Sequence, residues 1–338
     1  MKIHAFLSHL TGKQAYFSKH RTKKLLKRLD EIMPDVVHLH NLHHNYVNLN
    51  MLLSYLGEKN IKTVLTLHDC WFFTGKCTHY AQIGCEKWKQ GCGDCPLLES
   101  DNKSWFFDRT DKIWKDKKKY FERIDKLEVV GVSKWISEQA RKSFLKCGSI
   151  TTIHNGIDIR TFIPEGEDLR KKLGLEDKFV ILGMANKWLN KLNEGIFEQI
   201  EKCFGDACCI LLVGVKEVKK GNVICLDYVK SRDDLAKIYR TADVFVNVTH
   251  ADSLPTVNLE AMACGVPVVT YDVCGSTETI TEKTGIAVQE NDTEKLIDAI
   301  NEIKMMGMRT FSYECRDHIL KNYNADLSYE KYINIYER

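Results

Sequence analysis

The sequence predicts an α/β protein with two domains, each built on a parallel sheet. Short apolar runs rich in Val, Ile and Leu recur along the 338 residues and alternate with longer amphipathic segments. This alternation is typical of repeated strand–helix–strand units, whose strands pair in parallel. A single hydrophobic core rarely grows beyond roughly 250–300 residues, so a chain of this length is expected to form two cores.

Composition narrows the class of protein further. Hydrophobic residues make up 44% of the chain and the mean hydropathy is −0.30, which is typical of a globular protein. No apolar run approaches the roughly 18 residues of a membrane span. The first residues have too short an apolar core for a signal peptide, and the 13 cysteines of an unsignalled chain favour free thiols in a reducing compartment. We therefore expect a cytoplasmic location.

Charge is distributed unevenly along the chain. Residues 1–150 carry 26 Lys and Arg against 16 Asp and Glu, a net +10, whereas the remaining 188 residues carry 23 against 30, a net −7. Two basic runs, Lys19–Arg28 and Lys112–Lys119, have apolar residues at helical spacing and are interpreted as amphipathic helices with solvated basic faces. The alternative is peripheral contact with anionic lipid at the inner face of a membrane. Nucleic acid is disfavoured as a partner because no nucleic-acid motif accompanies the charge.

In the first half of the chain, β-branched apolar runs predict strands that alternate with helical patterns. An Asn155-Gly156 turn signal and the breaker Pro164 end this half. We therefore divide the chain into residues 1–155, 156–325 and a terminal segment 326–338. The strands of the first half are expected at residues 35–40, 61–69 and 127–132, and its helices at 19–28, 49–58 and from Lys134 onward.

The second half repeats the same alternation. Each expected strand is four to six residues of mostly Val, Ile, Leu, Phe and Cys, as in a sheet buried on both faces. Strands are expected at residues 179–184, 209–213, 223–226, 244–248 and 266–271, with helices at about 193–204, 232–241, 255–263 and 293–304.

The most informative stretch is Ala251–Tyr271, a short loop followed by a helix from about Pro255 and a buried strand. Asp252 or Ser253 is expected to cap the helix, and proline is tolerated in a first turn. Glu260 follows Asp252 by eight residues, which is roughly 12 Å at the helical rise of 1.5 Å per residue. The free N–H groups and the positive dipole at the helix start suit a diphosphate between the two carboxylates.

This stretch resembles the donor-binding motif of the retaining glycosyltransferases of family 4, the glycosyl transferases group 1. In that family a Glu, seven residues and a second Glu precede Ala-Met-Ala-X-Gly-X-Pro-Val-Val. Here the two acids are Asp252 and Glu260, and the tail matches residue for residue. The resemblance implies that Glu260 holds the ribose hydroxyls of a nucleotide sugar. It also implies a catalytic position for Asp252 beside the transferred sugar, with Ser253, Leu254, Pro255 and Thr256 binding the donor.

The resemblance covers almost the whole chain. Residues 131–136, 153–164 and 329–337 match the family's end of the first domain, interdomain stretch and terminal helix. It implies the GT-B fold, in which two Rossmann-like domains present parallel sheets to a cleft. Residues 1–155 would form the acceptor-side domain and 156–325 the nucleotide-sugar-binding domain, and the terminal helix would return toward the first domain.

Two groups of polar residues follow strands of the first half, where open α/β sheets bind ligands. The family carries His-Asp at the end of the second strand. This implies that His68 lies against the donor sugar near the reacting centre, with Asp69 in support. The acceptor-side candidates at the end of the preceding strand are His40, Asn41 and His43, and His38 within that strand is left without a role.

In three places the sequence departs from the family. The basic pair that binds the diphosphate is represented by Lys191, with Lys187 as a helper, but the second basic position is Leu192 or Asn193. Family members also open with a strand, a Gly-rich turn and a helix, whereas here the basic helix follows Met1 almost directly. We therefore expect the chain to start some tens of residues inside the usual first domain, leaving that domain incomplete. A further departure is Cys274, which replaces a family glycine. Tyr228 and Val229 are expected near the nucleotide base.

A Cys-rich insertion at residues 70–96 resembles that of a subset of family members involved in polysaccharide and colanic acid biosynthesis. Cys77, Cys85, Cys92 and Cys95 are separated by seven, six and two residues. Four thiols are sufficient for a tetrahedral, structural zinc site. The other interpretation, four free thiols lining a packed loop, stays open because the spacing is irregular.

Together these features predict an enzyme that transfers a hexose, with retention, from a nucleoside-diphosphate sugar to a glycan or lipid-linked acceptor in surface-polysaccharide assembly. The chain has no Asp-x-Asp, so no metal cofactor is expected for catalysis, and Lys191 and helix N-termini would meet the charge of the leaving group. The alternative is a shortened, catalytically impaired relative that serves as a binding or scaffold protein.

Overall fold

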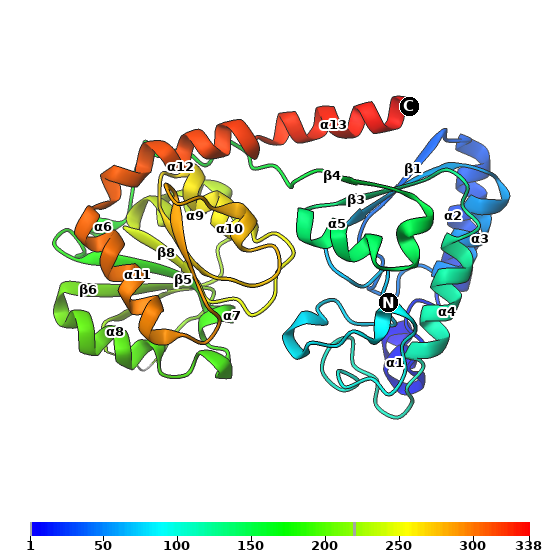
Figure 1. Ribbon diagram of the computed structural model, residues 1–338, viewed down its shortest axis with the longest axis horizontal. Coiled ribbons are helices and arrows are strands. Elements are labelled where there is room, and N and C mark those ends of the chain that lie inside the picture. Colours follow the sequence, from blue (N-terminus) through cyan, green and yellow to red (C-terminus); the bar gives the residue numbers. More distant parts are fainter. Residues whose placement is uncertain (1, 219–220) are drawn as a thin grey trace. The chain divides into compact units, whose positions relative to one another are not determined.

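The computed structural model describes residues 2–218 and 221–338. The chain forms two compact units, each with its own sheet (Figure 1). Unit 1 comprises Met1–His154 together with Lys331–Arg338, and unit 2 comprises Asn155–Glu330.

The sheet of unit 1 has four parallel strands in the order β1-β2-β3-β4. The three strands predicted from the sequence are confirmed, each slightly shorter than expected. The fourth was missed because its sequence, SITT, is polar and only partly buried. The strands are β1 Val36–Leu39, β2 Lys62–Leu67, β3 Leu127–Gly131 and β4 Ser149–Thr152.

Three helices of unit 1, α3, α4 and α5, each bury several residues on one side. In α3, Leu49, Leu52, Leu53 and Leu56 are buried at helical spacing, and the Asn48 side chain caps the first turn by accepting a hydrogen bond from the N–H of Met51. The helices are α1 Lys2–Thr11, α2 Lys19–Ile32, α3 Leu49–Glu58, α4 Thr110–Phe121 and α5 Lys134–Arg141.

The sheet of unit 2 has six parallel strands in the order β10-β9-β8-β5-β6-β7. The chain starts at the central strand β5, adds β6 and β7 on one side, then returns to add β8, β9 and β10 on the other. The strand order therefore reverses between β5 and β8. The strands are β5 Phe179–Met184, β6 Cys208–Val213, β7 Val223–Leu226, β8 Val244–Asn247, β9 Val268–Tyr271 and β10 Gly285–Val288.

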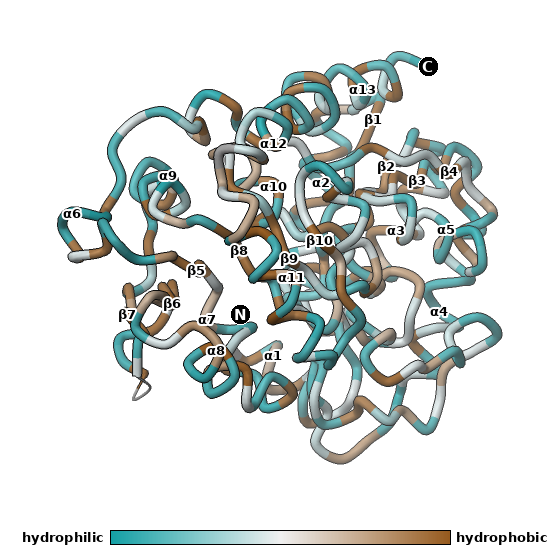
Figure 2. Tube along the Cα trace, turned by 60° about the vertical axis from the view of Figure 1, so that its left-hand side comes forward, coloured by the Kyte–Doolittle hydropathy of each residue, from teal (hydrophilic) through white to brown (hydrophobic). Residues whose placement is uncertain are grey.

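The core of unit 2 consists of its strands and the helices that cover them. Figure 2 shows hydrophobic residues along β8 and β9, whereas the outer helix α9 carries many hydrophilic positions. Helix α10 is buried on several sides, since it contacts β8, β9 and α12. The helices are α6 Arg170–Leu173, α7 Ala185–Trp188, α8 Ile196–Phe204, α9 Arg232–Thr241, α10 Thr256–Ala263, α11 Thr293–Met306 and α12 Met308–Asn322.

The last helix, α13 Ala325–Glu337, begins in unit 2 and ends in unit 1. Its residue Ile335 is buried in a cluster with Val64, Val130 and Ile153 of the unit 1 sheet. Among the described residues, no helix has the length and apolar character needed to cross a bilayer.

Candidate active site

In unit 2, the reversal of strand order between β5 and β8 marks the place where an open α/β sheet binds ligands, at the carboxyl ends of the strands. The segment after β5 carries Lys187 on α7, and the loop after β8 carries His250 and Asp252. The residues predicted to bind the donor diphosphate and sugar therefore follow the two strands that flank the reversal.

The loop before α10 differs from its predicted form. The helix starts at Thr256 with Pro255 as its N-cap and no side-chain cap, so the expected capping by Asp252 or Ser253 is wrong. Asp252 instead accepts a hydrogen bond from the N–H of Leu254 at 3.2 Å, forming a local turn. The rise of a helix does not apply across this turn, so it no longer supports the estimate of roughly 12 Å between the two carboxylates. Without a side-chain cap, the first N–H groups of α10 remain available to an anion.

Glu260 lies on α10 and is held by a residue that the motif does not contain. The hydroxyl of Tyr239, on α9, donates to Glu260 Oε2 at 2.9 Å. Burial raises the pKa of the Glu260 carboxyl, while the Tyr239 hydrogen bond and the charge of Arg232 lower it. Tyr239 itself is fully buried, and its hydrogen bond fixes one of the two carboxylate oxygens of Glu260.

The two predicted diphosphate lysines differ in their surroundings. Lys187 Nζ donates to Thr249 Oγ1 at 2.8 Å and lies 4.0 Å from Asp252 Oδ2. Lys191 is exposed, in a short 3-10 turn after α7. Asn193 is buried, and its amide donates to the main-chain oxygens of Lys187 and Val248 at 2.9 Å each. Asn193 therefore ties the segment after β5 to the loop after β8.

The residues predicted near the base lie in the loop that follows β7. Tyr228 is 74% exposed and lines an open pocket together with Val229. An exposed aromatic ring beside such a pocket is available for stacking on a base.

Sequence reasoning missed a pair in the same region, formed by the buried His250 and the exposed Glu290. His250 Nδ1 lies 2.5 Å from Glu290 Oε1, and its Nε2 lies 3.1 Å from Asn193 Oδ1. His250 follows β8 directly, a position that could have signalled a role. Glu290 is 40 residues away, and no local pattern links the two.

In unit 1, His40 and His68 follow the neighbouring strands β1 and β2. His40 Nδ1 and His68 Nε2 are 3.0 Å apart, one donating to the other. Burial lowers the pKa of both rings, to about 4 for His68, with a further contribution from His40. Both imidazoles are therefore neutral at pH 7, and His68 can donate or accept a hydrogen bond without carrying a charge.

Asp69 and His43 form a second polar group. Asp69 is buried and accepts a hydrogen bond from the N–H of Trp71 at 2.8 Å, and its other oxygen lies 3.8 Å from His43 Nδ1. Burial raises the pKa of Asp69 and lowers that of His43 to about 4. Asn41 is positioned separately, with its main-chain oxygen accepting from the Tyr46 hydroxyl at 2.8 Å.

His38 is left without a role in the sequence analysis; it lies on β1 and contacts both β2 and the terminal helix. Its Nε2 lies 2.7 Å from Thr66 Oγ1 and its Nδ1 lies 2.6 Å from the hydroxyl of Tyr336 on α13. Its ring is 4.1 Å from that of His40, measured between centroids. The histidines at the ends of β1 and β2 are therefore connected to α13.

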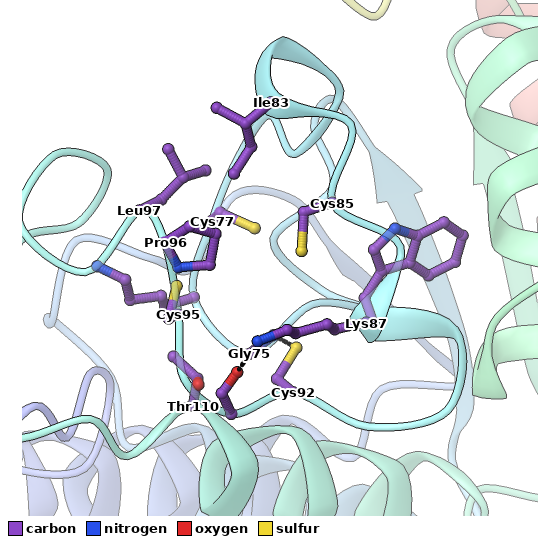
Figure 3. Close-up of a pocket in the computed structure, with 13 residues that line it drawn as sticks. Gly75, Cys77, Ile83, Cys85, Lys87, Cys92, Cys95, Pro96, Leu97 and Thr110 are labelled. Carbon is purple, nitrogen blue, oxygen red and sulfur yellow. Dashed lines mark hydrogen bonds between the residues drawn. The ribbon is translucent and has the colours of Figure 1, made fainter.

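Four of the five cysteines of the insertion, namely Cys77, Cys85, Cys92 and Cys95, line one small cavity of about 20 Å³ (Figure 3). That volume suits a single water molecule or ion and excludes a sugar or a nucleotide. Burial raises the pKa of the Cys77 thiol to about 12 and that of Cys92 to about 11. As the side chains are placed, no three His, Cys, Asp or Glu side chains in residues 2–218 and 221–338 form a group that could hold a metal ion.

Comparison with known proteins identifies the family. The model of "Glycosyltransferase Family 4" matches residues 3–161, and that of "Glycosyl transferases group 1" matches residues 141–304. The chain belongs to the group 1 glycosyltransferases of family 4. WcaC of Escherichia coli (strain K12), named for colanic acid biosynthesis, is 26% identical over 315 residues, covering 90% of this chain and 76% of that protein.

Solved structures show that the fold is GT-B, as predicted. Sucrose-phosphate synthase from Thermosynechococcus elongatus superposes with a TM-score of 0.66 at 19% identity, covering 94% of this chain and 77% of that one. HepE from Anabaena, in complex with UDP, gives a TM-score of 0.64 at 15% identity, covering 93% of this chain and 80% of that one. At these identities the likeness establishes the fold alone.

Proposed function

We propose that this glycosyltransferase transfers a hexose from a nucleoside-diphosphate sugar, with retention, to a glycan or lipid-linked acceptor in surface-polysaccharide assembly. The relative named for colanic acid biosynthesis supports the pathway class. The reaction would take place at the inner face of the cell membrane, without a metal cofactor for catalysis.

One observation carries the proposal: the arrangement of Glu260, Tyr239 and the uncapped start of α10 after the strand-order reversal of unit 2. Tyr239 holds one oxygen of Glu260, which leaves the other to accept hydrogen bonds from the ribose hydroxyls. The open N–H groups of α10 suit the diphosphate. Lys187, beside Asp252, supplies a positive charge to the same loop.

In the proposed mechanism, the negative charge of the departing diphosphate is stabilised by Lys187, Lys191 and the N-terminus of α10. The acceptor hydroxyl attacks from the face that the diphosphate leaves, and the leaving phosphate takes its proton, which gives retention without an enzymatic nucleophile. Asp252 contacts the transferred sugar. The family resemblance implies that His68 contacts the same sugar, and we assign it a hydrogen bond made as a neutral imidazole, with Asp69 in support. We assign His40, Asn41 and His43 to the binding of the acceptor.

The decisive experiment measures ligand binding by thermal unfolding of the purified chain with UDP, GDP, ADP and their hexose conjugates. HepE was solved with UDP-glucose, so UDP and UDP-glucose are tested first. A ligand that binds only the folded state raises the melting temperature by mass action. We expect a rise for one nucleotide that is lost in Glu260→Ala and kept in Glu302→Ala, a matched change at an exposed glutamate of α11.

The same samples test the alternative, a binding or scaffold protein. The observation that favours it is the second position of the basic pair that binds the diphosphate in the family, where this chain has no basic residue. Leu192 is exposed there, and the amide of Asn193 donates to two main-chain oxygens. Nucleotide binding without hydrolysis or transfer of any donor sugar would support this alternative. No shift for any nucleotide in a folded sample would contradict both the donor site and the proposed enzyme.

A further inference from the structure

The Cys-rich insertion of unit 1 lies in a long irregular segment, residues 68–109, between β2 and α4. Its only regular elements are the 3-10 turns Ala81–Ile83 and Lys87–Lys89. Segments of this length without secondary structure are uncommon in compact domains unless they are functional or held by something. This one is nevertheless well buried around Trp71, Phe72, Phe73 and Trp88.

The backbone directs cysteines from several turns toward one cavity. Figure 3 shows the sulfur atoms of Cys77, Cys85, Cys92 and Cys95 around its interior. Between the last two cysteines, Gly93 has φ 143° and Asp94 has φ 42°. A left-handed conformation is unfavourable for a residue with a side chain, so the surrounding structure must hold Asp94 in this tight turn.

The main chain also donates to this cluster. The N–H of Gly75 donates to Cys92 Sγ at 3.2 Å. A side chain at Gly75 would meet Thr110 Cβ at 2.6 Å and Cys92 Cβ at 3.0 Å, so only glycine allows this close approach. An amide hydrogen bond to sulfur stabilises a thiolate more than a neutral thiol.

Two buried lysines lie next to the cluster, and their charge needs compensation. Lys117, on α4, is 1% exposed, and its Nζ donates to the main-chain oxygens of Trp71 and Thr74. Lys76 is 3% exposed and donates to the main-chain oxygens of Leu98 and Asp101, at 2.7 Å each. Within residues 2–218 and 221–338, neither forms an ion pair with a carboxylate. Two buried ammonium groups are costly unless negative charge lies near them.

We propose that Cys77, Cys85, Cys92 and Cys95 bind one zinc ion as thiolates, and that Lys76 and Lys117 balance its charge. Four thiols lose four protons and take up Zn²⁺, so the centre carries two negative charges, which match the two buried ammonium groups. The thiols do not form a closed ligand set as placed, so binding requires them to turn inward across a cavity of about 20 Å³. A site closed by four thiolates is structural and would order the segment that carries Asp69.

The first test is the metal content of the full chain, purified without a polyhistidine tag or chelators. We expect about one zinc per chain by elemental analysis, and a thiolate-to-metal charge-transfer absorption when cobalt replaces zinc. Cys92→Ser and Cys95→Ser should lose both signals. Cys147→Ser and Cys203→Ser, at exposed cysteines, are the matched controls and should keep them.

A second measurement does not depend on variants that fold poorly. Titration of the unmodified protein with a mercurial reagent should release the zinc in step with the modification of about four thiols. The proposal would be overturned if the purified protein contained no zinc, or if the cobalt-loaded protein showed no charge-transfer band. Disulfides among the four cysteines, or full zinc content in both Cys92→Ser and Cys95→Ser, would also overturn it.

The charge-balance part has its own test. We expect Lys117→Met to transfer zinc to a chromogenic chelator at least about tenfold faster than the unmodified chain, in line with the usual cost of losing an outer-shell partner. Lys115→Met, at an exposed lysine of the same helix, is the control. Equal transfer rates for Lys117→Met and the unmodified chain would overturn the role of that lysine.

Discussion

The carboxylate of Glu260 is oriented by Tyr239, which lies 21 residues earlier in the sequence. The motif provides the acid but not the group that fixes it. At the scale of single residues, the donor site therefore depends on contacts between elements as much as on the motif, and the Asn193–His250–Glu290 series is a second example.

Tyr239→Phe should weaken donor binding while leaving the chemical step nearly unchanged. The substitution removes the hydroxyl that donates a hydrogen bond to Glu260. Because that hydrogen bond lowers the pKa of the Glu260 carboxyl, its loss should raise this pKa further. A lost hydrogen bond to a charged group costs about 1.5–3 kcal/mol, so KM for the donor should increase by about tenfold or more. Steady-state kinetics check this, and a fall in kcat with unchanged KM would contradict it.

Three half-buried histidines make the stability of unit 1 depend on pH. His38, His43 and His68 each have a pKa lowered to about 4, with burial as the main cause. In the unfolded chain an imidazole titrates near 6.5. As the pH falls from about 6.5 to 4, these imidazoles become protonated in the unfolded state but remain neutral in the folded state. The free energy of unfolding of unit 1 should therefore decrease across this window. Asp69, whose pKa is raised, acts in the opposite direction.

Urea unfolding at several pH values checks this prediction, and tryptophan fluorescence reports mainly on unit 1, which holds five of the six tryptophans. His68→Gln should reduce the pH dependence between 6.5 and 4. A flat stability profile in that window would contradict the neutral state of these half-buried rings.

At the scale of elements, the sequence predicted strands better than helix ends. The strands Phe179–Met184, mostly buried, and Val223–Leu226, half-buried, match residue for residue because each is a short apolar run with β-branched residues. The cap of α10 failed because Asp252 forms a local turn. The solvated basic face assigned to residues 112–119 is wrong at Lys117, which is buried against Trp71. The amphipathic pattern could not reveal that an ammonium group would find two main-chain oxygens in a distant loop.

The attachment of α13 to the sheet of unit 1 can be tested with a pair of isoleucines. Ile335 is 4% exposed and packs on Val64, Val130 and Ile153, whereas Ile333 on the same helix is 49% exposed. Deleting a buried isoleucine side chain costs about 2–5 kcal/mol. Ile335→Ala should therefore lower the unfolding free energy of unit 1 by at least about 2 kcal/mol, and Ile333→Ala by less than about 0.5 kcal/mol.

Fluorescence-detected urea unfolding separates these outcomes. If both variants unfold at the same urea concentration, α13 does not contribute to the core of unit 1. Tyr336→Phe provides an intermediate case, because it removes only the hydroxyl that pairs with His38 and should cost about 1 kcal/mol.

At the scale of the whole molecule, the uneven charge gives unit 1 a surface suited to anionic partners. The exposed residues of α2 include Lys23, Lys24 and Lys27, and Leu25 on the same helix is 41% exposed. A helix that exposes both lysines and apolar side chains is suited to the interface of an anionic membrane. A lipid-linked acceptor would make such contact useful, because it would hold the enzyme near its substrate.

We expect the chain to co-sediment with vesicles that contain phosphatidylglycerol and not with phosphatidylcholine vesicles. Binding should weaken steeply with salt, because the Debye length falls from about 10 Å at 0.1 M to about 3 Å at 1 M. Each lysine near an anionic surface contributes about 1 kcal/mol, so replacing Lys23, Lys24 and Lys27 with Gln should weaken binding about a hundredfold. The control replaces three exposed lysines of unit 2, Lys171, Lys172 and Lys202. Equal loss in both triple variants would assign the attraction to overall charge, and equally tight, salt-sensitive binding to duplex DNA would contradict the expectation that nucleic acid is not a partner.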